Sequence, residues 1–367
     1  MTTVAVIGAG MVGSSTAMRI GEARLADRIA IVDVREGVAQ AMALDITQAL
    51  AAVGNDARCD AGWAAVGGAD VVVLTAGLPR NPGQSRADLL AVNGKIVVDC
   101  CREIRHRAPD SVVIVVTNPL DEMTALAQRA LGFPATRVIG MAGTLDSARF
   151  RAAIAARLDV PASKVEALTL GSHGETMVPV PRLSTVNGQR LTELLSEAEI
   201  EQLAERTREG GAEIVRLLER GSAWWAPSAA ILDLVRSIVR DERRVLPVCA
   251  MCRGQFGIRN TYVGVPARLG RDGVAEIVDP GLTAAEVAGL RAAAEQIAAR
   301  VGDLDAVLDE DPAPPPPPEV AEGQLRVGVR DLAYESRIRT EARRALAREG
   351  ALHRLDDVVA AALRRVR

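Results

Sequence analysis

Aromatic residues are scarce in this chain of 367 residues, which has three phenylalanines, three tryptophans and two tyrosines. So few rings leave little material for the stacking platforms that hold the bases of single-stranded nucleic acids. Positive charge is not in excess either, because the formal net charge is −3. A charge of that size provides no strong field toward nucleic acid or an anionic membrane surface. The sequence therefore predicts a protein that binds neither nucleic acid nor membranes.

Long apolar runs and export signals are also lacking. No stretch is long and apolar enough to span a bilayer. The N-terminal segment MTTVAVIGAG has no basic residues before its apolar part, so we expect no signal peptide. The five cysteines are an odd number, which argues against a disulfide framework and for a reducing compartment. These absences predict a cytoplasmic location.

Cys249 and Cys252 form a CxxC pair in the segment LPVCAMCRG. If that segment is a strand, residues three apart point to opposite faces of the sheet. No second pair and no nearby histidine complete the four ligands of a structural zinc site. We therefore predict no metal site.

Residues 3–33 carry the pattern of a dinucleotide-binding unit. The apolar, β-branched run TVAVIG predicts a buried parallel strand. It leads into GAGMVG, where Gly8, Gly10 and Gly13 have the G-x-G-x-x-G spacing, and a second apolar run reaches Asp33 twenty residues later. The glycines permit a tight turn close to a pyrophosphate at the helix N-terminus. The Asp33 carboxylate can bind a ribose and would repel a 2′-phosphate, so the unit favours NAD over NADP. The alternative, a glycine-rich turn that binds no ligand, is disfavoured by the complete pattern.

Two further apolar runs end in polar groups. ADVVVLTAG, residues 69–77, predicts a buried strand that continues into the loop LPRNPGQSR, which carries Arg80 and Arg86. SVVIVVTNPL, residues 111–120, predicts another strand, with Asn118 at its end. Ligands bind at the carboxyl ends of the strands in parallel sheets. The two arginines therefore suggest a lid that brings cationic groups to an anion, although solvated surface arginines are the ordinary alternative.

His173 is the main candidate for proton transfer. The chain has three histidines, and His106 and His353 lie among arginines in helix-like sequence. His173 instead follows VEALTL, residues 165–170, which reads as one strand that breaks at Gly171. It stands in a glycine-flanked turn, where side chains are exposed on a rigid scaffold, and histidine titrates near neutral pH. From these residues alone, a histidine that merely caps the local backbone is the alternative.

Asp146 and Arg149 lie between these elements, in RVIGMAGTLDSARFR, residues 137–151. This segment predicts a short strand that enters a helix. Residues three apart on a helix share a face, so the two side chains should contact each other. Such a pair is normally a surface ion pair, but here it lies close in the sequence to the predicted cleft.

Together these segments resemble the lactate/malate dehydrogenase family over residues 1–310. The carrying motifs are GAGMVG with Asp33, LTAGLPRNPGQSRADLL, VVTNPLDEMT, GMAGTLDSARFR and LGSHGETMVP, with GGAEIVRLLERGSAWWAPS and GQFGIRNTYVGVP downstream. The resemblance implies NAD as the cofactor and a homodimer or homotetramer. It also implies malate dehydrogenase activity of the lactate-dehydrogenase-like type, because the position of Arg80 holds Arg in the malate enzymes and Gln in the lactate enzymes.

The resemblance implies three catalytic residues. His173 takes the hydroxyl proton during malate oxidation and returns it in the reverse direction. Asp146 orients the imidazole and stabilises its charged form. Arg86 polarises the reacting carbonyl as negative charge grows on its oxygen.

It also implies residues that bind the substrate and the cofactor. Besides Arg86, Arg149 binds the carboxylate next to the reacting carbon, and Arg80 pairs with the distal carboxylate. Asn118 contacts both the substrate and the nicotinamide half of the cofactor, and its peptide bond to Pro119 is expected to be cis. The other cofactor-binding residues implied are Gly8, Ala9, Gly10, Met11, Val12, Gly13, Asp33, Asn93, Val116 and Thr117.

Two positions near the predicted base depart from the family pattern. Glu175 stands where Asp usually follows His-Gly, and Ser172 replaces a more usual Gly or Glu. Neither change removes a catalytic side chain.

The predicted fold class is α/β, with a Rossmann-type doubly wound parallel sheet over residues 1–143 and an α+β catalytic domain over residues 144–310. A proline-rich stretch, residues 311–322, predicts an extended linker. Residues 323–367 have apolar residues at helical spacing, which predicts a helical C-terminal extension. Its charges are mixed in sign, which favours docking to a protein partner or a neighbouring subunit over a membrane surface. A dehydrogenase for another 2-hydroxy acid, and an interaction protein that works through this extension, are the alternatives left open.

Overall fold

The computed structural model describes residues 1–79, 86–174, 176–219, 221–302 and 304. Arg80 and Glu175, the linker predicted over residues 311–322 and the extension predicted over residues 323–367 lie outside these residues.

Six parallel strands form the first half of the main sheet, in the order β3-β2-β1-β4-β5-β6. Every residue of β1, β4 and β5 is buried, as expected for strands covered on both faces. This order and direction confirm the predicted doubly wound sheet. The six strands are β1 (Thr3–Ile7), β2 (Arg28–Val32), β3 (Arg58–Ala61), β4 (Val71–Leu74), β5 (Val112–Val115) and β6 (Val138–Gly140).

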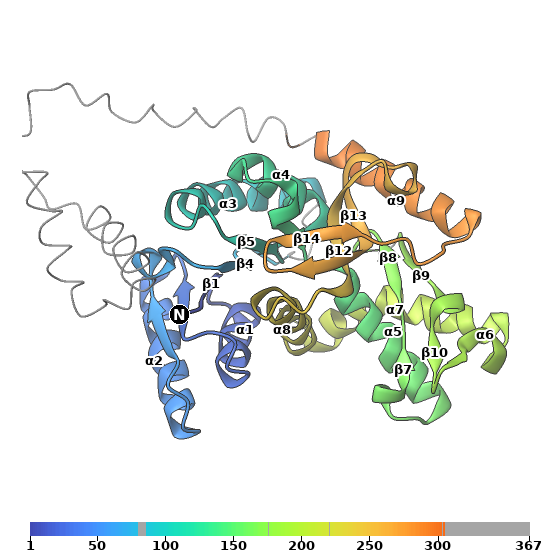
Figure 1. Cartoon of the computed structure of the whole chain (residues 1–367), viewed down its shortest axis with the longest axis horizontal. Coiled ribbons are helices and arrows are strands. Elements are labelled where there is room, and N and C mark those ends of the chain that lie inside the picture. Colours follow the sequence, from blue (N-terminus) through green and yellow to red (C-terminus); the bar gives the residue numbers. More distant parts are fainter. Residues whose placement is uncertain (80–85, 175, 220, 303, 305–367) are drawn as a thin grey trace, which may run out of the picture. The chain divides into compact units, whose positions relative to one another are not determined.

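Helices cover the two faces of the parallel strands (Figure 1). In that view α3 and α4 lie above the strands, and α1, α2 and α8 lie below them. In α1 the buried residues Gly13, Thr16, Ala17 and Ile20 recur at the spacing of one helix face. The helices are α1 (Met11–Glu22), α2 (Glu36–Ala52), α3 (Arg86–Arg107), α4 (Leu120–Leu131) and α8 (Trp225–Val239), and the 3₁₀ turns η1 (Trp63–Val66) and η2 (Ala135–Arg137) lie between strands.

Antiparallel strands continue the same sheet beyond β6. β12 (Arg244–Arg253) joins β6 at Cys249 and Gly140, and pairs along its length with β13 (Arg259–Gly270). β13 also pairs with β14 (Gly273–Ile277) and, at one residue, with β8 (Thr169–Gly171), which pairs with β9 (Met177–Pro179). Over the described residues the result is one sheet of 11 strands.

A glycine allows β13 to join β8. A Cβ atom on Gly264 would lie 2.3 Å from the carbonyl oxygen of Gly171, which no side chain tolerates. The close approach holds the strand that leads to His173 against the long β12–β13 hairpin. The strand that precedes His173 is therefore fixed in the main sheet.

The prediction of one strand over residues 165–170 is wrong. The structure has β7 (Val165–Glu166) and then β8, and the two strands belong to different sheets. β7 pairs with β10 (Thr185–Val186) in a small sheet, whereas β8 pairs within the main sheet. Between them, the carbonyl oxygen of Leu168 accepts a hydrogen bond from Val180. A continuous apolar run cannot reveal a change of strand partner in its middle.

A second, smaller hydrophobic core lies beside the small sheet. Phe150 and Ile154 of α5 pack there with Val165, Leu191 and Leu203. α7 begins with a capping box, in which Ser196 and Glu199 satisfy each other's backbone N–H groups. No helix within the described ranges is long and apolar enough to cross a membrane. The remaining elements are α5 (Gly143–Leu158), α6 (Leu191–Leu194), α7 (Glu197–Leu218), α9 (Ala284–Gly302), β11 (Gln189–Arg190), η3 (Ala162–Lys164), η4 (Pro181–Leu183) and η5 (Gln255–Gly257).

Candidate active site

His173 and Asp146 form a hydrogen-bonded pair. His173 follows the end of β8, and Asp146 lies in the first turn of α5. The ring Nδ1 is 2.9 Å from Asp146 Oδ2. The side chain of Asp146 is 2% exposed and that of His173 is 15% exposed. The bond commits Nδ1 to Asp146, so Nε2 is the ring nitrogen that can exchange a proton with a ligand.

The same carboxylate also holds Arg149. Arg149 Nη1 donates to Asp146 Oδ1 over 3.1 Å, and the two residues are three apart on α5. Asp146 therefore lies between an imidazole and a guanidinium, with one oxygen bonded to each. Unlike an ordinary surface ion pair, this one is largely buried, since the side chain of Arg149 is only 17% exposed.

The environment of His173 favours its protonated form. Burial of the ring opposes protonation, but the charge of Asp146 and its hydrogen bond outweigh burial, so the pKa of His173 is raised above the usual histidine value. Arg149 lowers this pKa, and Asp121 raises it. A histidine with these neighbours is suited to both accept and release a proton.

Asp121 is a site residue that the sequence analysis missed. Its Oδ2 accepts a hydrogen bond of 2.9 Å from the backbone N–H of His173. It lies in the first turn of α4, two residues after Pro119, and is 1% exposed. Burial and the adjacent Glu122 raise the pKa of its carboxyl group, whereas the hydrogen bond from His173 lowers it. Two adjacent acids in the first turn of a helix, followed by the largely apolar run MTALA, were the available signal.

The glycine-rich turn leaves room for a ligand at the N-terminus of α1. Gly10 is the N-cap residue, so no side chain caps the first turn, and a Cβ atom there would meet nothing within 4 Å. Gly8 has φ +109°, and a Cβ atom on Gly13 would lie 1.8 Å from the Gly8 carbonyl oxygen. The turn therefore requires glycine for its own packing. Its free backbone N–H groups face open space, which fits a pyrophosphate.

Asp33 holds this turn in place. Its Oδ2 accepts a hydrogen bond of 3.0 Å from the backbone N–H of Ala9, and its Oδ1 accepts one of 3.0 Å from the backbone N–H of Arg35. The Arg35 side chain lies 3.4 Å from Oδ1 and is 69% exposed. A carboxylate has about four lone-pair sites, so Asp33 keeps acceptor capacity for the hydroxyl groups of a ribose.

The Asn93 side chain links the backbone segment that follows β4 to the one that follows β5. Its side-chain amide donates to the carbonyl oxygens of Asn118, over 2.7 Å, and of Leu78, over 3.1 Å. Its Oδ1 accepts from the backbone N–H of Leu78 over 2.8 Å. Both amide hydrogens are therefore committed to the protein, so Asn93 positions its neighbours. The Asn118–Pro119 peptide bond is cis, as expected, and Asn118 is exposed.

The backbone N–H of Val116 and the hydroxyl group of Thr117, which follow β5, are already bonded within the protein. The backbone N–H of Val116 donates to Leu74 within the sheet, and the Thr117 hydroxyl donates to Ala76 over 2.6 Å. Of the groups predicted to lie near the nicotinamide half, the carbonyl oxygens are therefore better placed to bind a ligand than the N–H of Val116 or the hydroxyl of Thr117. Met11, at the start of α1, is 60% exposed.

Comparison with known protein families identifies this arrangement. The NAD binding domain of lactate/malate dehydrogenase matches residues 2–140, and the α/β C-terminal domain of the same family matches residues 143–306. The chain belongs to the lactate/malate dehydrogenase family. It is therefore an NAD-dependent oxidoreductase, and the predicted resemblance is confirmed.

Relatives in the family cover most of the chain. It is 43% identical to the malate dehydrogenase of Salinibacter ruber over 84% of this chain and 98% of that protein. It is 46% identical to that of Trichormus variabilis over 80% of this chain and 91% of that protein. The solved Salinibacter ruber enzyme has a TM-score of 0.80, with 41% identity over 84% of this chain and 99% of that one. A lactate dehydrogenase of Cryptosporidium parvum, solved with lactic acid and nicotinamide adenine dinucleotide, has a TM-score of 0.78, with 34% identity over 85% of this chain and 99% of that one.

The structure places the family's expected site residues in two groups. His173, Asp146 and Arg149 form one hydrogen-bonded cluster, and Asp121 ties its backbone to the turn that contains Asn118. The glycine turn with Asp33 forms the second group, at the carboxyl ends of β1 and β2. Arg80 lies outside the described residues, and of Arg86 the structure describes only the backbone, at the start of α3.

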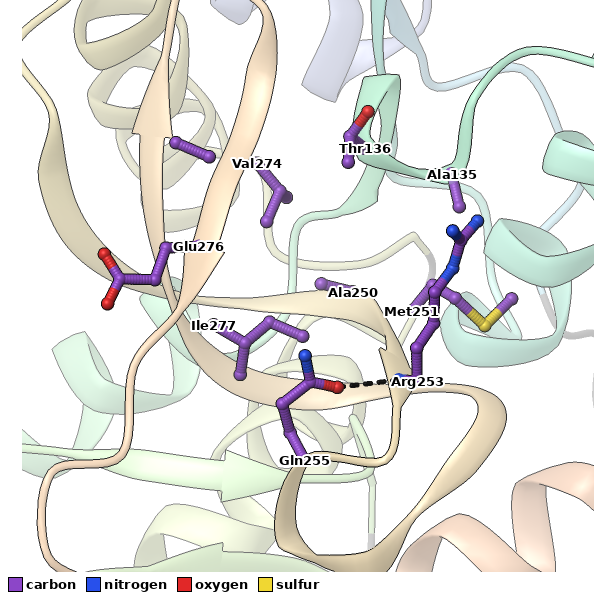
Figure 2. Close-up of a pocket in the computed structure, with 10 residues that line it drawn as sticks. Ala135, Thr136, Ala250, Met251, Arg253, Gln255, Val274, Glu276 and Ile277 are labelled. Carbon is purple, nitrogen blue, oxygen red and sulfur yellow. Dashed lines mark hydrogen bonds between the residues drawn. The ribbon is translucent and has the colours of Figure 1, made fainter.

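A separate cavity of about 140 Å³ lies between η2, β12 and β14 (Figure 2). Its wall includes Arg253 and Gln255, where the Gln255 side chain accepts a hydrogen bond of 2.7 Å from the backbone N–H of Arg253. Glu276 also lines it and pairs with Arg268 over 3.1 Å. Its wall contains none of the predicted site residues that the structure describes, so we assign it no part in catalysis.

The cysteines are free thiols in this structure, with Cys59, Cys101, Cys249 and Cys252 buried and Cys100 half-buried. Burial raises the pKa of Cys252 to about 12, which keeps the thiol protonated and unreactive. Among the described residues, no three His, Cys, Asp or Glu side chains gather as a metal site would require.

Proposed function

We propose that this protein catalyses the reversible, NAD-dependent oxidation of (S)-malate to oxaloacetate. The observation that carries the proposal is the shared Asp146 carboxylate, which holds an imidazole on one oxygen and a guanidinium on the other. Such a pair offers a proton acceptor next to a fork that binds carboxylates. The malate dehydrogenases of Salinibacter ruber and Trichormus variabilis, at 43% and 46% identity, support this choice of substrate.

His173 is assigned the proton transfer. In malate oxidation Nε2 takes the proton of the substrate hydroxyl group while Nδ1–H stays bonded to Asp146. The resulting imidazolium is stabilised by the Asp146 carboxylate, the same effect that raises the pKa of His173. In oxaloacetate reduction the imidazolium returns this proton to the carbonyl oxygen.

The arginines are assigned the substrate's charges. Arg149 binds the carboxylate next to the reacting carbon, using the donors that Asp146 does not occupy. Arg86 polarises the reacting carbonyl, and Arg80 pairs with the distal carboxylate that malate has and lactate lacks. Asn118 orients the substrate from the exposed turn after β5.

The hydride chemistry would be supplied by bound NAD, as acceptor in malate oxidation and, as NADH, as donor in the reverse direction. The backbone of Gly8 to Gly13 would bind its pyrophosphate, and Asp33 its adenosine ribose. Asn93 would hold the backbones of Leu78 and Asn118 in place beside the nicotinamide half of NAD.

A dehydrogenase for a monocarboxylic 2-hydroxy acid is the second candidate. The lactate dehydrogenase of Cryptosporidium parvum, with a TM-score of 0.78 to this chain, favours it. The reacting half of the site serves either substrate, because His173, Asp146 and Arg149 address only the hydroxyl group and the adjacent carboxylate that both acids share.

One assay separates the two functions. NADH oxidation is followed with oxaloacetate and with pyruvate under the same conditions, and kcat/KM is compared. We expect oxaloacetate to be preferred by roughly thirtyfold to several-thousandfold, because a buried charge without a partner costs about 2–5 kcal/mol, and the Arg80 cation would lack a partner with pyruvate. A preference for pyruvate would overturn the malate assignment in favour of the second candidate.

We also propose a homodimer or homotetramer in the cytoplasm, as the family resemblance implies, with residues 323–367 docking to a protein partner or a neighbouring subunit. Sedimentation analysis of the full chain and of a chain ending at Asp311 tests this. An equal number of subunits in the two assemblies would show that the extension does not build the oligomer.

A further inference from the structure

Two adjacent glycines stand in the interior of α7, at positions 210 and 211. Glycine is a poorer helix former than every residue except proline. Two adjacent glycines in the middle of a 22-residue helix therefore indicate that a neighbouring group leaves little room for side chains there. The functional assignments above leave these glycines unused, although α7 packs against α5, the helix that carries Arg149.

The side chain of Arg149 passes directly over this pair. A Cβ atom on Gly210 would lie 3.5 Å from Arg149 Cδ, which is ordinary contact with the aliphatic stem. A Cβ atom on Gly211 would lie 3.3 Å from Arg149 Nη2, which is tighter than nearly all real contacts of a Cβ atom. The stem therefore tolerates a methyl group at position 210, whereas the guanidinium must shift by a few tenths of an ångström to admit one at position 211.

The guanidinium has little freedom to make that shift. Its Nη1 is bonded to Asp146 Oδ1 over 3.1 Å, and the group is planar and rigid. Pushing Nη2 away from α7 therefore rotates the whole fork about the Asp146 contact. The fork lies between the carboxylate on one side and the bare α7 backbone on the other, and its direction depends on both.

We propose that Gly211 is a positioning residue that sets the direction in which Arg149 presents its donors to the substrate carboxylate. The inference uses one part of the proposed function, namely that Arg149 binds the carboxylate beside the reacting carbon. Oxaloacetate and pyruvate both carry that group, so the inference holds for either of the two candidate substrates.

The chain supplies a matched control for the test. Gly211→Ala and Gly210→Ala make the same chemical change in the same helix turn, and no positive φ hinders either. Both should favour the helix to a similar degree and leave Tm unchanged or raise it by about 1–3 °C. Only Gly211→Ala should move the guanidinium.

Steady-state kinetics on the full-length enzyme, with the ketoacid the wild type prefers, provides the readout. Gly211→Ala should raise KM for the ketoacid roughly tenfold, since a displacement of about 1 Å costs about a hundredfold and this one is smaller. Its KM for NADH should stay at the wild-type value, and Gly210→Ala should stay within about twofold of wild type in all parameters. Equal ketoacid KM values for the two variants would overturn the inference while leaving the proposed function intact, since the latter is judged on wild-type substrate preference.

A second background shows whether the effect acts through Arg149. In an Arg149→Lys enzyme the forked head is absent, so adding Gly211→Ala should raise the ketoacid KM no further than adding Gly210→Ala does. An undiminished tenfold effect of Gly211→Ala in that background would mean that the methyl group acts on the helix or on the substrate directly, and would overturn the assignment.

Discussion

Replacing Asp146 with Asn should shift the pH dependence of catalysis to lower pH. The neutral amide removes the charge that raises the pKa of His173, while burial and Arg149, which both lower it, remain. Oxaloacetate reduction needs the imidazolium, so its kcat/KM falls as pH rises through this pKa. In the variant that fall should therefore come at lower pH, and reduction at neutral pH should lose most of its rate.

The size of the shift follows from the charges involved. Opposite unit charges about 4 Å apart attract by about 4 kcal/mol at an effective dielectric near 20. One pKa unit corresponds to about 1.36 kcal/mol, so the upper limit is about 3 units. The side chain of His173 is 15% exposed, so solvent screens part of this attraction, and we expect a shift of about 1–3 units.

The amide also changes which ring nitrogen carries the proton. Asp146 accepts from both His173 and Arg149, and an amide has one oxygen for these two partners. Arg149 has only donors, so the amide oxygen should face Arg149 and the NH₂ group should face Nδ1 of His173. Neutral His173 would then carry its proton on Nε2 and could not act as the base. We therefore expect malate oxidation to fall by about a hundredfold to ten-thousandfold, the larger figure being that of the comparable change in a serine protease triad.

Asp99→Asn is the matched control for this experiment. Asp99 and Arg102 are also three residues apart on a helix and 2.8 Å apart, but the side chain of Asp99 is 70% exposed. Kinetics and pH profile should stay at wild-type values in that variant. If the Asp146→Asn enzyme kept the wild-type pH profile for oxaloacetate reduction, the titration would belong to a group other than His173, and the proton-transfer assignment would fail.

Three further predictions concern single side chains. His173→Asn should lower kcat at least about a hundredfold while NADH binding, measured by calorimetry, persists, and near-normal turnover would exclude His173 as the acid–base group. NAD should be preferred over NADP by up to about a thousandfold in kcat/KM, because the Asp33 carboxylate repels a 2′-phosphate by about 4 kcal/mol; comparable kcat/KM values would mean that Arg35, paired with Asp33, receives that phosphate instead. Arg80→Gln should lower kcat/KM for oxaloacetate by roughly thirtyfold to several-thousandfold, from a cost of about 2–5 kcal/mol, and raise it for pyruvate; a parallel fall with both ketoacids would point to general damage.

The nucleotide-binding half could be read from the sequence because its signals are local. The buried strands are continuous β-branched runs, such as residues 71–74. Gly8, Gly13 and Asp33 lie in one short segment, so their meeting in space follows from one strand–turn–helix–strand unit. His173 was singled out by its glycine-flanked turn, and Asp146 and Arg149 by their spacing on a helix, but only the family resemblance implied that all three share one site. The structure shows the hydrogen bonds that join them.

The contacts that position the site were not predictable, because they join segments far apart in the chain. Asp121 bonds to the backbone of a residue 52 positions away, and no local pattern marks an acid whose partner is a main-chain N–H. Both amide hydrogens of Asn93, which is predicted to lie near the nicotinamide half of the cofactor, are bound to backbone carbonyls 15 and 25 positions away. The break between Glu166 and Thr169 depends on which strands pair beside them, which one apolar run does not encode.

The joint between β6 and β12 has a consequence for the order in which the chain can fold. Gly140 of β6 pairs with Cys249 of β12, so roughly a hundred residues must be synthesised between the two strands. Ribosomes add about 5–20 residues per second, and β6 therefore lacks its neighbour for on the order of 5–20 s. During that time β6 presents unpaired N–H and C=O groups on an apolar edge, which can pair with another chain. The nucleotide-binding half therefore cannot complete its own sheet as it leaves the ribosome. A chain released near residue 143 should associate through this edge, and newly made protein should depend on chaperones until the β12–β13 hairpin arrives.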